Sequence, residues 1–166
     1  MNSFPTILVD LDWNKFAQVP ETAEHPKGFT VYKIIINCVP NNAINLNPVQ
    51  FLCWKRYSNI QDLHKKLSTR HRQLLRHGHF PTFAPPKLIG RHDIETIRER
   101  QKSTEEFLNY TLKDIVLLRS GILQGFFEES DLDKPEIFFD QSPTSESEPP
   151  LVPILADKMM QAASEE

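Results

Sequence analysis

"VQFLCWKRYSNIQDLHKKL", residues 49–67, joins an apolar run to an amphipathic one with no loop between them. Its first part, residues 49–56, is rich in apolar and aromatic side chains and predicts a β-strand. Ser58 and Gln61 have the spacing of a capping box, which predicts that a helix starts at Ser58. The stretch therefore predicts a strand that passes directly into a helix, with a cation and an aromatic ring at the junction.

Upstream of this stretch the sequence predicts two further strands. Residues 29–39, FTVYKIIINCV, are rich in β-branched and aromatic side chains, as expected for a strand. A shorter candidate covers Phe16 to Val19 and should end at Pro20, which has no N–H to donate to a sheet. The connection at residues 40–48 is rich in Asn and Pro and predicts a loop, so the strands should form an antiparallel meander.

Downstream, the predicted helix carries an apolar stripe at helical spacing and should end near Gly78, since Gly often follows a helix C-terminus. The stripe consists of Ile60, Leu63, Leu67, Leu74 and Leu75. Residues 80–87, FPTFAPPK, contain three prolines, which favour polyproline II conformation over a helix or a central strand.

A second long helix is expected between Ile94 and Ile115, where apolar residues again recur at helical spacing. Polar side chains interrupt the stripe around Thr104, so the middle of this helix should be less buried. Ser120 can cap a last short helix that completes the core. These elements predict an α+β fold in which a three-stranded antiparallel sheet packs on helices.

The composition changes near residue 130, beyond which acidic residues, Ser and Pro become frequent. We expect an N-terminal extension at residues 1–11, a folded unit at 12–129 and a disordered tail at 130–166. A chain of 166 residues suits one such unit with a tail.

The net charge of −3 hides a strong segregation of charge along the chain. Residues 55–102 carry 12 basic and 4 acidic side chains, whereas residues 103–166 carry 4 basic and 14 acidic ones. Such a basic block indicates a polyanionic partner, which could be nucleic acid, anionic lipid or an acidic protein. The alternative is a basic face that is simply solvated. Its cations are not interleaved with exposed aromatic rings, which disfavours nucleic acid.

The sequence contains no apolar run of the roughly 18–20 residues that span a bilayer. Its first residues lack the basic region of a signal peptide, so a cytoplasmic protein is expected. Cys38 and Cys53 lie in strand-like runs and are interpreted as two free core thiols, with a pair facing each other on neighbouring strands as the alternative.

The sequence offers little for catalysis. It contains no recognisable nucleophile–base set and no Gly-rich phosphate loop, and its six His residues form no HExxH pattern. His77 and His79 share a loop but have no Cys partner. We therefore expect no enzyme, no cofactor and no functional metal site.

The junction between strand and helix is better suited to binding an anion. Arg56 at the end of a strand can direct its planar guanidinium at a phosphate, and the ring of Tyr57 offers a flat apolar face to a sugar or inositol. The alternative for Arg56 is an ion pair on the surface with Asp62 or another helix carboxylate.

In order and spacing, these segments resemble the phox-homology (PX) domains of the sorting nexin family. The resemblance rests on the strands, "KRYS", the basic helix, "FPTFAPPK" and "IRERQKSTEEFL", and covers about residues 14–129. It implies a three-stranded antiparallel sheet on a helical subdomain with a proline-rich loop. It also implies binding of phosphoinositides, most often phosphatidylinositol 3-phosphate, by a peripheral protein of early endosome membranes that acts in protein transport.

The resemblance assigns roles to four residues. Arg56 matches the arginine that grips the 3-phosphate, and Tyr57 matches the aromatic under the inositol ring. Arg100 matches the helix arginine that hydrogen-bonds the 4- and 5-hydroxyls. Lys87 corresponds to the lysine that contacts the 1-phosphate, although "PTFAPPK" places it one position later than the family's Pro-x-x-Pro-x-Lys. Either a shifted loop brings Lys87 to the phosphate or Arg91 substitutes for it.

Two apolar features point to further partners. Leu88 and Ile89 follow the prolines and could dip into the membrane interface, or else pack against the helices. Phe138 and Phe139 lie in an acidic tract that resembles motifs docking on trafficking proteins, with a plain linker as the alternative. Because the lysine is displaced, a protein-interaction module with weak or lost lipid binding remains the alternative function.

Overall fold

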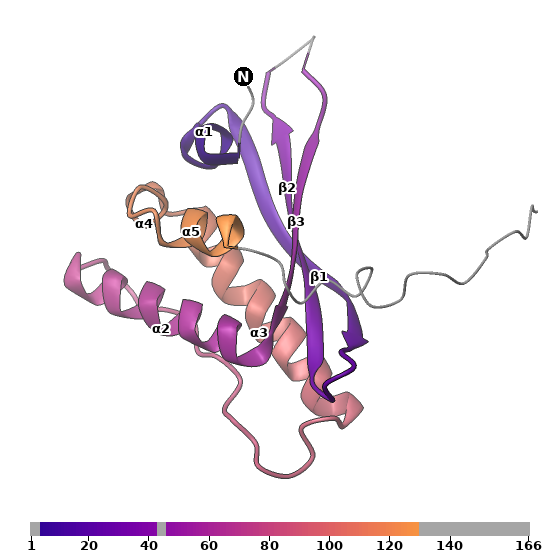
Figure 1. Cartoon of the computed structure of the whole chain (residues 1–166). Helices are drawn as coiled ribbons and strands as arrows, with labels where there is room; N and C mark the ends of the chain where they lie inside the picture. The colour runs from indigo at the N-terminus through magenta and orange to yellow at the C-terminus, as the bar shows by residue number, and fades with distance from the viewer. Residues whose placement is uncertain (1–3, 43–45, 130–166) are drawn as a thin grey trace, which may run out of the picture.

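The computed structural model describes residues 4–42 and 46–129. Three strands form one antiparallel sheet in the order β1-β2-β3, with β1 at Trp13–Glu24, β2 at Thr30–Pro40 and β3 at Val49–Arg56. The helices pack on one side of this sheet (Figure 1). They are α1 (Phe4–Val9), α2 (Tyr57–Gln73), α3 (Ile94–Leu112), α4 (Ile115–Leu118) and α5 (Ile122–Glu128). The predicted α+β class and three-stranded meander are confirmed.

Strand β1 is much longer than the segment Phe16–Val19, and the prediction that it ends at Pro20 is wrong. The register shifts by one residue between Gln18 and Glu21, so the proline lies in a β-bulge. Because β1 is an edge strand, the missing N–H of Pro20 removes no hydrogen bond from a neighbour.

Helix α3 covers the free edge of β1 with side chains. Asn109 accepts a hydrogen bond from the Ala17 N–H at 2.9 Å and donates one to the Ala17 carbonyl at 3.0 Å. The Val19 N–H donates to the Glu105 carboxylate at 2.7 Å, and the Gln101 amide donates to the Val19 carbonyl at 2.8 Å. Polar residues of the second long helix thus satisfy the strand edge, which sequence periodicity alone could not show.

Helix α2 begins one residue earlier than predicted and without the expected capping box. Arg56 is its N-cap, with no side-chain capping bond, and Ser58 already lies in the first turn. The helix ends at Gln73 rather than near Gly78. A Schellman motif closes it, in which the Arg76 N–H donates to the His71 carbonyl at 3.2 Å and Leu75 takes the left-handed position with φ 52°.

The middle of α3 is buried, contrary to the prediction. Thr104 is inaccessible to solvent, and its hydroxyl donates to the Arg100 carbonyl at 2.6 Å. This face of the helix keeps helical spacing but is rich in hydroxyl groups, three of which donate to carbonyls of the same helix. Its buried members are Thr96, Arg100, Ser103, Thr104, Phe107, Leu108, Thr111 and Leu112.

One core joins the sheet to the helices. Helix α1 contributes Ile7 and Leu8 to it, so this core includes residues of the predicted extension 1–11. Cys38 and Cys53 are buried in the core and form no disulfide, as expected, and burial raises the pKa of Cys38 to about 11. The predicted tail lies outside the described residues, as do Phe138 and Phe139.

Candidate anion-binding site

A cavity of about 250 Å³ lies where the β1–β2 turn, the β3–α2 junction, the proline-rich segment and α3 meet. Four of its lining residues lie in the loop that joins α2 to α3, and Figure 1 shows the path of that loop. All the predicted headgroup contacts and the auxiliary Arg91 line this one cavity. Its lining residues are Gly28, Phe29, Thr30, Arg56, Tyr57, Ser58, Pro86, Lys87, Arg91, His92 and Arg100.

Arg56 presents its guanidinium at the end of β3, where the chain turns into α2. Its Nε donates to the Asn59 side-chain oxygen at 3.1 Å, and the guanidinium carbon lies 5.3 Å from the centre of the Phe29 ring. Asp62, the predicted alternative partner, pairs instead with Lys66 at 2.9 Å. Within the described part of the chain no carboxylate pairs with Arg56, so its charge is available to a ligand.

Arg100 is a buried cation. Only 6% of the residue is exposed, and its guanidinium carbon lies 3.8 Å from the centre of the Tyr57 ring. Its Nε has no hydrogen-bond partner, and no acidic side chain of the described residues forms an ion pair with it. A buried charge without a counter-charge is costly, so an anion in the cavity would relieve a strain already present.

Tyr57 links the cavity to the proline-rich segment. Its hydroxyl donates to the Ala84 carbonyl at 2.8 Å, and its ring stacks on Phe83 with the centres 5.4 Å apart. Burial raises the pKa of the phenol, while the charge of Arg100 opposes that shift. Tyr57 therefore packs against Arg100 and holds the proline-rich segment in place. Its role as a platform for an inositol ring remains a prediction.

Further contacts hold the proline-rich segment against α2 and α3. The His64 ring donates to the Pro81 carbonyl at 2.7 Å, and the Ala84 N–H donates to the Ser103 hydroxyl at 3.2 Å. The Phe83 ring also stacks on His64. These anchors, which the sequence did not reveal, fix the path of the chain just before Lys87.

Lys87 reaches the cavity despite its displaced position in the sequence, and Arg91 lines the same cavity. The Lys87 ammonium is engaged, however, with the Glu99 carboxylate at 3.0 Å and the Thr96 hydroxyl at 3.2 Å. Neither partner was singled out in the sequence. Lys87 and Arg91 thus both remain candidates for the 1-phosphate contact, although the charge of Lys87 is already paired with Glu99.

Leu88 and Ile89 project from the loop beside the cavity. They are 100% and 92% exposed, so they do not pack against the helices. Two adjacent, fully exposed aliphatic side chains next to a cluster of cations suit contact with a lipid interface.

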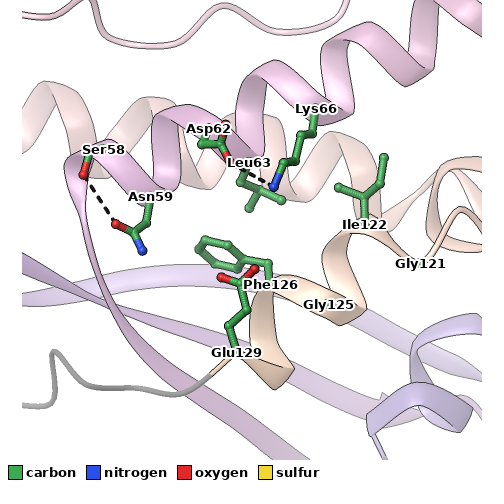
Figure 2. Close-up of a pocket in the computed structure, with 10 residues that line it drawn as sticks. All are labelled: Ser58, Asn59, Asp62, Leu63, Lys66, Gly121, Ile122, Gly125, Phe126 and Glu129. Carbon is green, nitrogen blue, oxygen red and sulfur yellow. Dashed lines mark hydrogen bonds and ion pairs between the residues drawn. The ribbon is translucent and has the colours of Figure 1, made fainter.

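A larger groove of about 460 Å³ separates α2 from α5, and Figure 2 shows the side chains that line it. Its charged groups are Asp62, Lys66 and Glu129, and Lys66 is paired with Asp62. Two carboxylates against one ammonium make this groove a poor site for an anion, in contrast to the smaller cavity.

No helix in the described part of the chain is long and apolar enough to cross a membrane. Residues 4–42 and 46–129 also contain no group of three or more His, Cys, Asp or Glu side chains that could hold a metal ion.

Comparison with known proteins gives a consistent match. The family model described as "PX domain" matches residues 46–130. Human ribosomal protein S6 kinase delta-1 is 38% identical over 119 residues, which cover 70% of this chain and 11% of that protein. Human sorting nexin-15 is 31% identical over 125 residues, which cover 75% of this chain and 36% of that protein.

A solved structure, that of a designed CISK-PX domain, aligns with a TM-score of 0.50 and 19% identity. The alignment covers 68% of this chain and 97% of that domain. At this level of identity the similarity concerns the fold.

Proposed function

The chain belongs to the PX domain family, and we propose on that basis that it is a phosphoinositide-binding, membrane-targeting module. The observation that carries the proposal is Arg100, a buried arginine that has no counter-charge among the described residues and lines the same cavity as Arg56, Lys87 and Arg91. A phosphorylated headgroup supplies the missing negative charge. The proposed biological setting is endosomal trafficking and protein sorting, as a peripheral protein on early endosomes.

The headgroup is proposed to be that of phosphatidylinositol 3-phosphate, with roles that follow the family resemblance. Arg56 binds the 3-phosphate, Arg100 the 4- and 5-hydroxyls, and Lys87 or Arg91 the 1-phosphate, while Tyr57 lies against the ring. Each charge-assisted hydrogen bond contributes about 1.5–3 kcal/mol before desolvation and ordering offset part of it. Arg56, Arg91 and Arg100 have no acidic partner among the described residues, so several such bonds are available to one headgroup.

Membrane association is proposed to combine headgroup binding with shallow insertion. Leu88 and Ile89 are placed to enter the interface when the cavity holds a headgroup, and nearby cations add attraction to an anionic leaflet. The proposed role is binding without catalysis. The kinase relative is matched over 11% of its length, so its enzymatic activity is not carried over to this chain.

One observation favours the second candidate, a protein-interaction module with weak lipid binding. The ion pair between Lys87 and Glu99 removes one cation from the ligand's reach. Phe138 and Phe139 are proposed as a docking segment for trafficking proteins, which a pull-down with the tail peptide would test.

Liposome sedimentation against all seven phosphoinositides separates the two candidates. We expect the chain to sediment with phosphatidylinositol 3-phosphate at micromolar affinity and to ignore phosphatidylcholine. Absence of sedimentation with every phosphoinositide, from protein that folds cooperatively, would favour the interaction module.

A further inference from the structure

Glu99 stands out among the charged residues near the cavity. The ion pairs of the described residues are Lys33–Glu21, Lys55–Glu129, Lys66–Asp62, Arg76–Asp114, Lys87–Glu99 and Lys102–Glu106. Of these, the pair with Glu99 is the one that includes a cation of the cavity lining. The other lining arginines have no acidic partner among those residues, so a single carboxylate counterbalances the site.

The position of Glu99 brings its charge close to the ligand space. It precedes Arg100 on α3, and its carboxylate reaches across to the Lys87 ammonium at 3.0 Å. Its field extends into the cavity as far as Tyr57. Burial is the main cause of the raised pKa of that phenol, Arg100 opposes it, and Glu99 raises it further.

A negative charge at this rim acts on ligands according to their charge. Each phosphate adds about −1.5 to −2 charges near neutral pH. Coulomb repulsion grows in proportion to ligand charge, and Glu99 contacts the lining residue Lys87, so a headgroup in the cavity would lie within about one Debye length of this carboxylate at physiological ionic strength. A carboxylate that is tolerated with one ring phosphate therefore becomes increasingly unfavourable with two or three.

We propose that Glu99 is a specificity-determining residue that restricts the cavity to headgroups with a single ring phosphate. It does so by neutralising Lys87 and by repelling the additional phosphates of more highly charged headgroups. The inference rests on the proposed phosphoinositide binding and names the ligand class of that same cavity. A purely structural tether between α3 and the proline-rich segment would leave the choice of headgroup unaffected.

The test compares two affinities rather than one. Vesicles contain either phosphatidylinositol 3-phosphate or phosphatidylinositol 3,4,5-trisphosphate, with phosphatidylserine adjusted so that total surface charge is equal. Glu99→Gln is expected to raise the affinity ratio of trisphosphate to monophosphate vesicles by roughly three- to tenfold, since one full charge is removed from a solvent-accessible rim. Lys87→Gln is expected to lower the same ratio, because it leaves the Glu99 carboxylate unpaired.

Glu106→Gln is the matched control. It removes the same charge from the same helix, in a surface pair with Lys102 outside the cavity, and should leave the ratio unchanged. Soluble inositol phosphates in place of vesicles repeat the comparison without a membrane. They separate discrimination of the headgroup from attraction to a charged surface.

The outcomes distinguish this inference from the proposed function. The inference is wrong if Glu99→Gln leaves the ratio of trisphosphate to monophosphate affinity as it is in the unmodified chain. This includes the case in which the affinities for both kinds of vesicle rise by the same factor. If the unmodified chain binds no phosphoinositide at all, the proposed function fails and the inference fails with it. If the trisphosphate-to-monophosphate affinity ratio rises in Glu99→Gln but not in Glu106→Gln, the result supports both phosphoinositide binding and the role of Glu99.

Discussion

At the level of single residues, Arg100 is the one buried cation among the described residues that line the cavity. Arg100 is only 6% exposed, its Nε has no hydrogen-bond partner and it has no acidic partner in the described part of the chain, so we expect it to destabilise the ligand-free fold. The Tyr57 ring beneath it offsets only part of that cost, because a cation–π contact contributes about 0.5–2 kcal/mol. We therefore expect the residue to lower the stability of the ligand-free protein and to favour binding of an anion.

Replacing Arg100 by a neutral side chain of similar length tests this trade. Arg100→Met is expected to leave the unfolding free energy of the ligand-free protein unchanged or to raise it by about 1 kcal/mol, because methionine fills the same space without a charge. Ligand-induced stabilisation by a soluble phosphoinositide should disappear. Thermal denaturation with and without ligand measures both effects.

Arg98→Met, an exposed neighbour on the same helix, is the control and should keep the ligand-induced shift in Tm. A loss of more than about 2 kcal/mol in ligand-free Arg100→Met would mean that the guanidinium is satisfied within the fold.

The sequence predicts the cations of the site better than their partners. Arg56, Lys87 and Arg100 belong to recognisable segments, and all three line one cavity. The sequence does not predict Glu99 as the partner of Lys87 or Phe29 as the ring beside Arg56, since each pairing joins residues of different segments. Pairing of this kind depends on tertiary packing, which local patterns do not encode.

At the level of elements, the centres of strands and helices follow from the sequence and their ends do not. Residues 49–56 form the predicted strand β3, because its apolar run is continuous. The sequence predicts that α2 starts at Ser58, because Ser58 and Gln61 have the spacing of a capping box. The N-cap is instead Arg56, so Ser58 already lies within the first turn. The sequence predicts that β1 ends at Pro20, whereas the strand continues to Glu24 because a β-bulge accommodates the proline on the edge strand.

The C-terminus of α2 gives a prediction about stability. Leu75 holds φ 52°, a conformation that costs a residue with a Cβ about 1 kcal/mol or more, and its side chain is 85% exposed. Leu75→Gly should therefore raise the unfolding free energy by about 0.5–1 kcal/mol, as measured by urea denaturation.

Leu75→Ala separates backbone strain from loss of the side chain. It removes most of the same apolar surface but keeps the Cβ, so it should change stability by less than about 0.5 kcal/mol. Equal effects of the two substitutions would contradict the explanation by backbone strain.

At the level of the whole molecule, charge and apolar exposure converge at one end. Lys87 and Arg91 of the cavity lining belong to the same loop as the exposed pair Leu88 and Ile89, and this loop joins α2 to α3 (Figure 1). The net charge of −3 thus gives no guide to the surface that we propose meets the membrane. The segregation of basic residues into 55–102 is the better guide, and it is visible in the sequence.

Insertion of this loop is testable separately from headgroup binding. The double variant Leu88→Glu and Ile89→Glu should weaken binding to phosphatidylinositol 3-phosphate vesicles by about tenfold or more, because two apolar side chains no longer enter the interface. Affinity for the soluble headgroup should change by less than about threefold, an effect of added charge alone.

Leu11→Glu is the control for the loop variant. Leu11 is 71% exposed but lies outside the cavity, so its substitution should not affect vesicle binding. A loss of soluble-headgroup affinity equal to the loss on vesicles would show that the loop acts on the cavity and not through insertion.

The most direct test of phosphoinositide binding by this cavity is calorimetric titration of soluble phosphatidylinositol 3-phosphate into matched variants. Arg56→Gln should reduce affinity at least about tenfold, since it removes one charge-assisted contact, and should leave Tm within a degree of the unmodified chain. Arg72→Gln, an exposed arginine of α2 outside the cavity, should bind as the unmodified chain does. Equal affinity of Arg56→Gln and Arg72→Gln would contradict binding at this site.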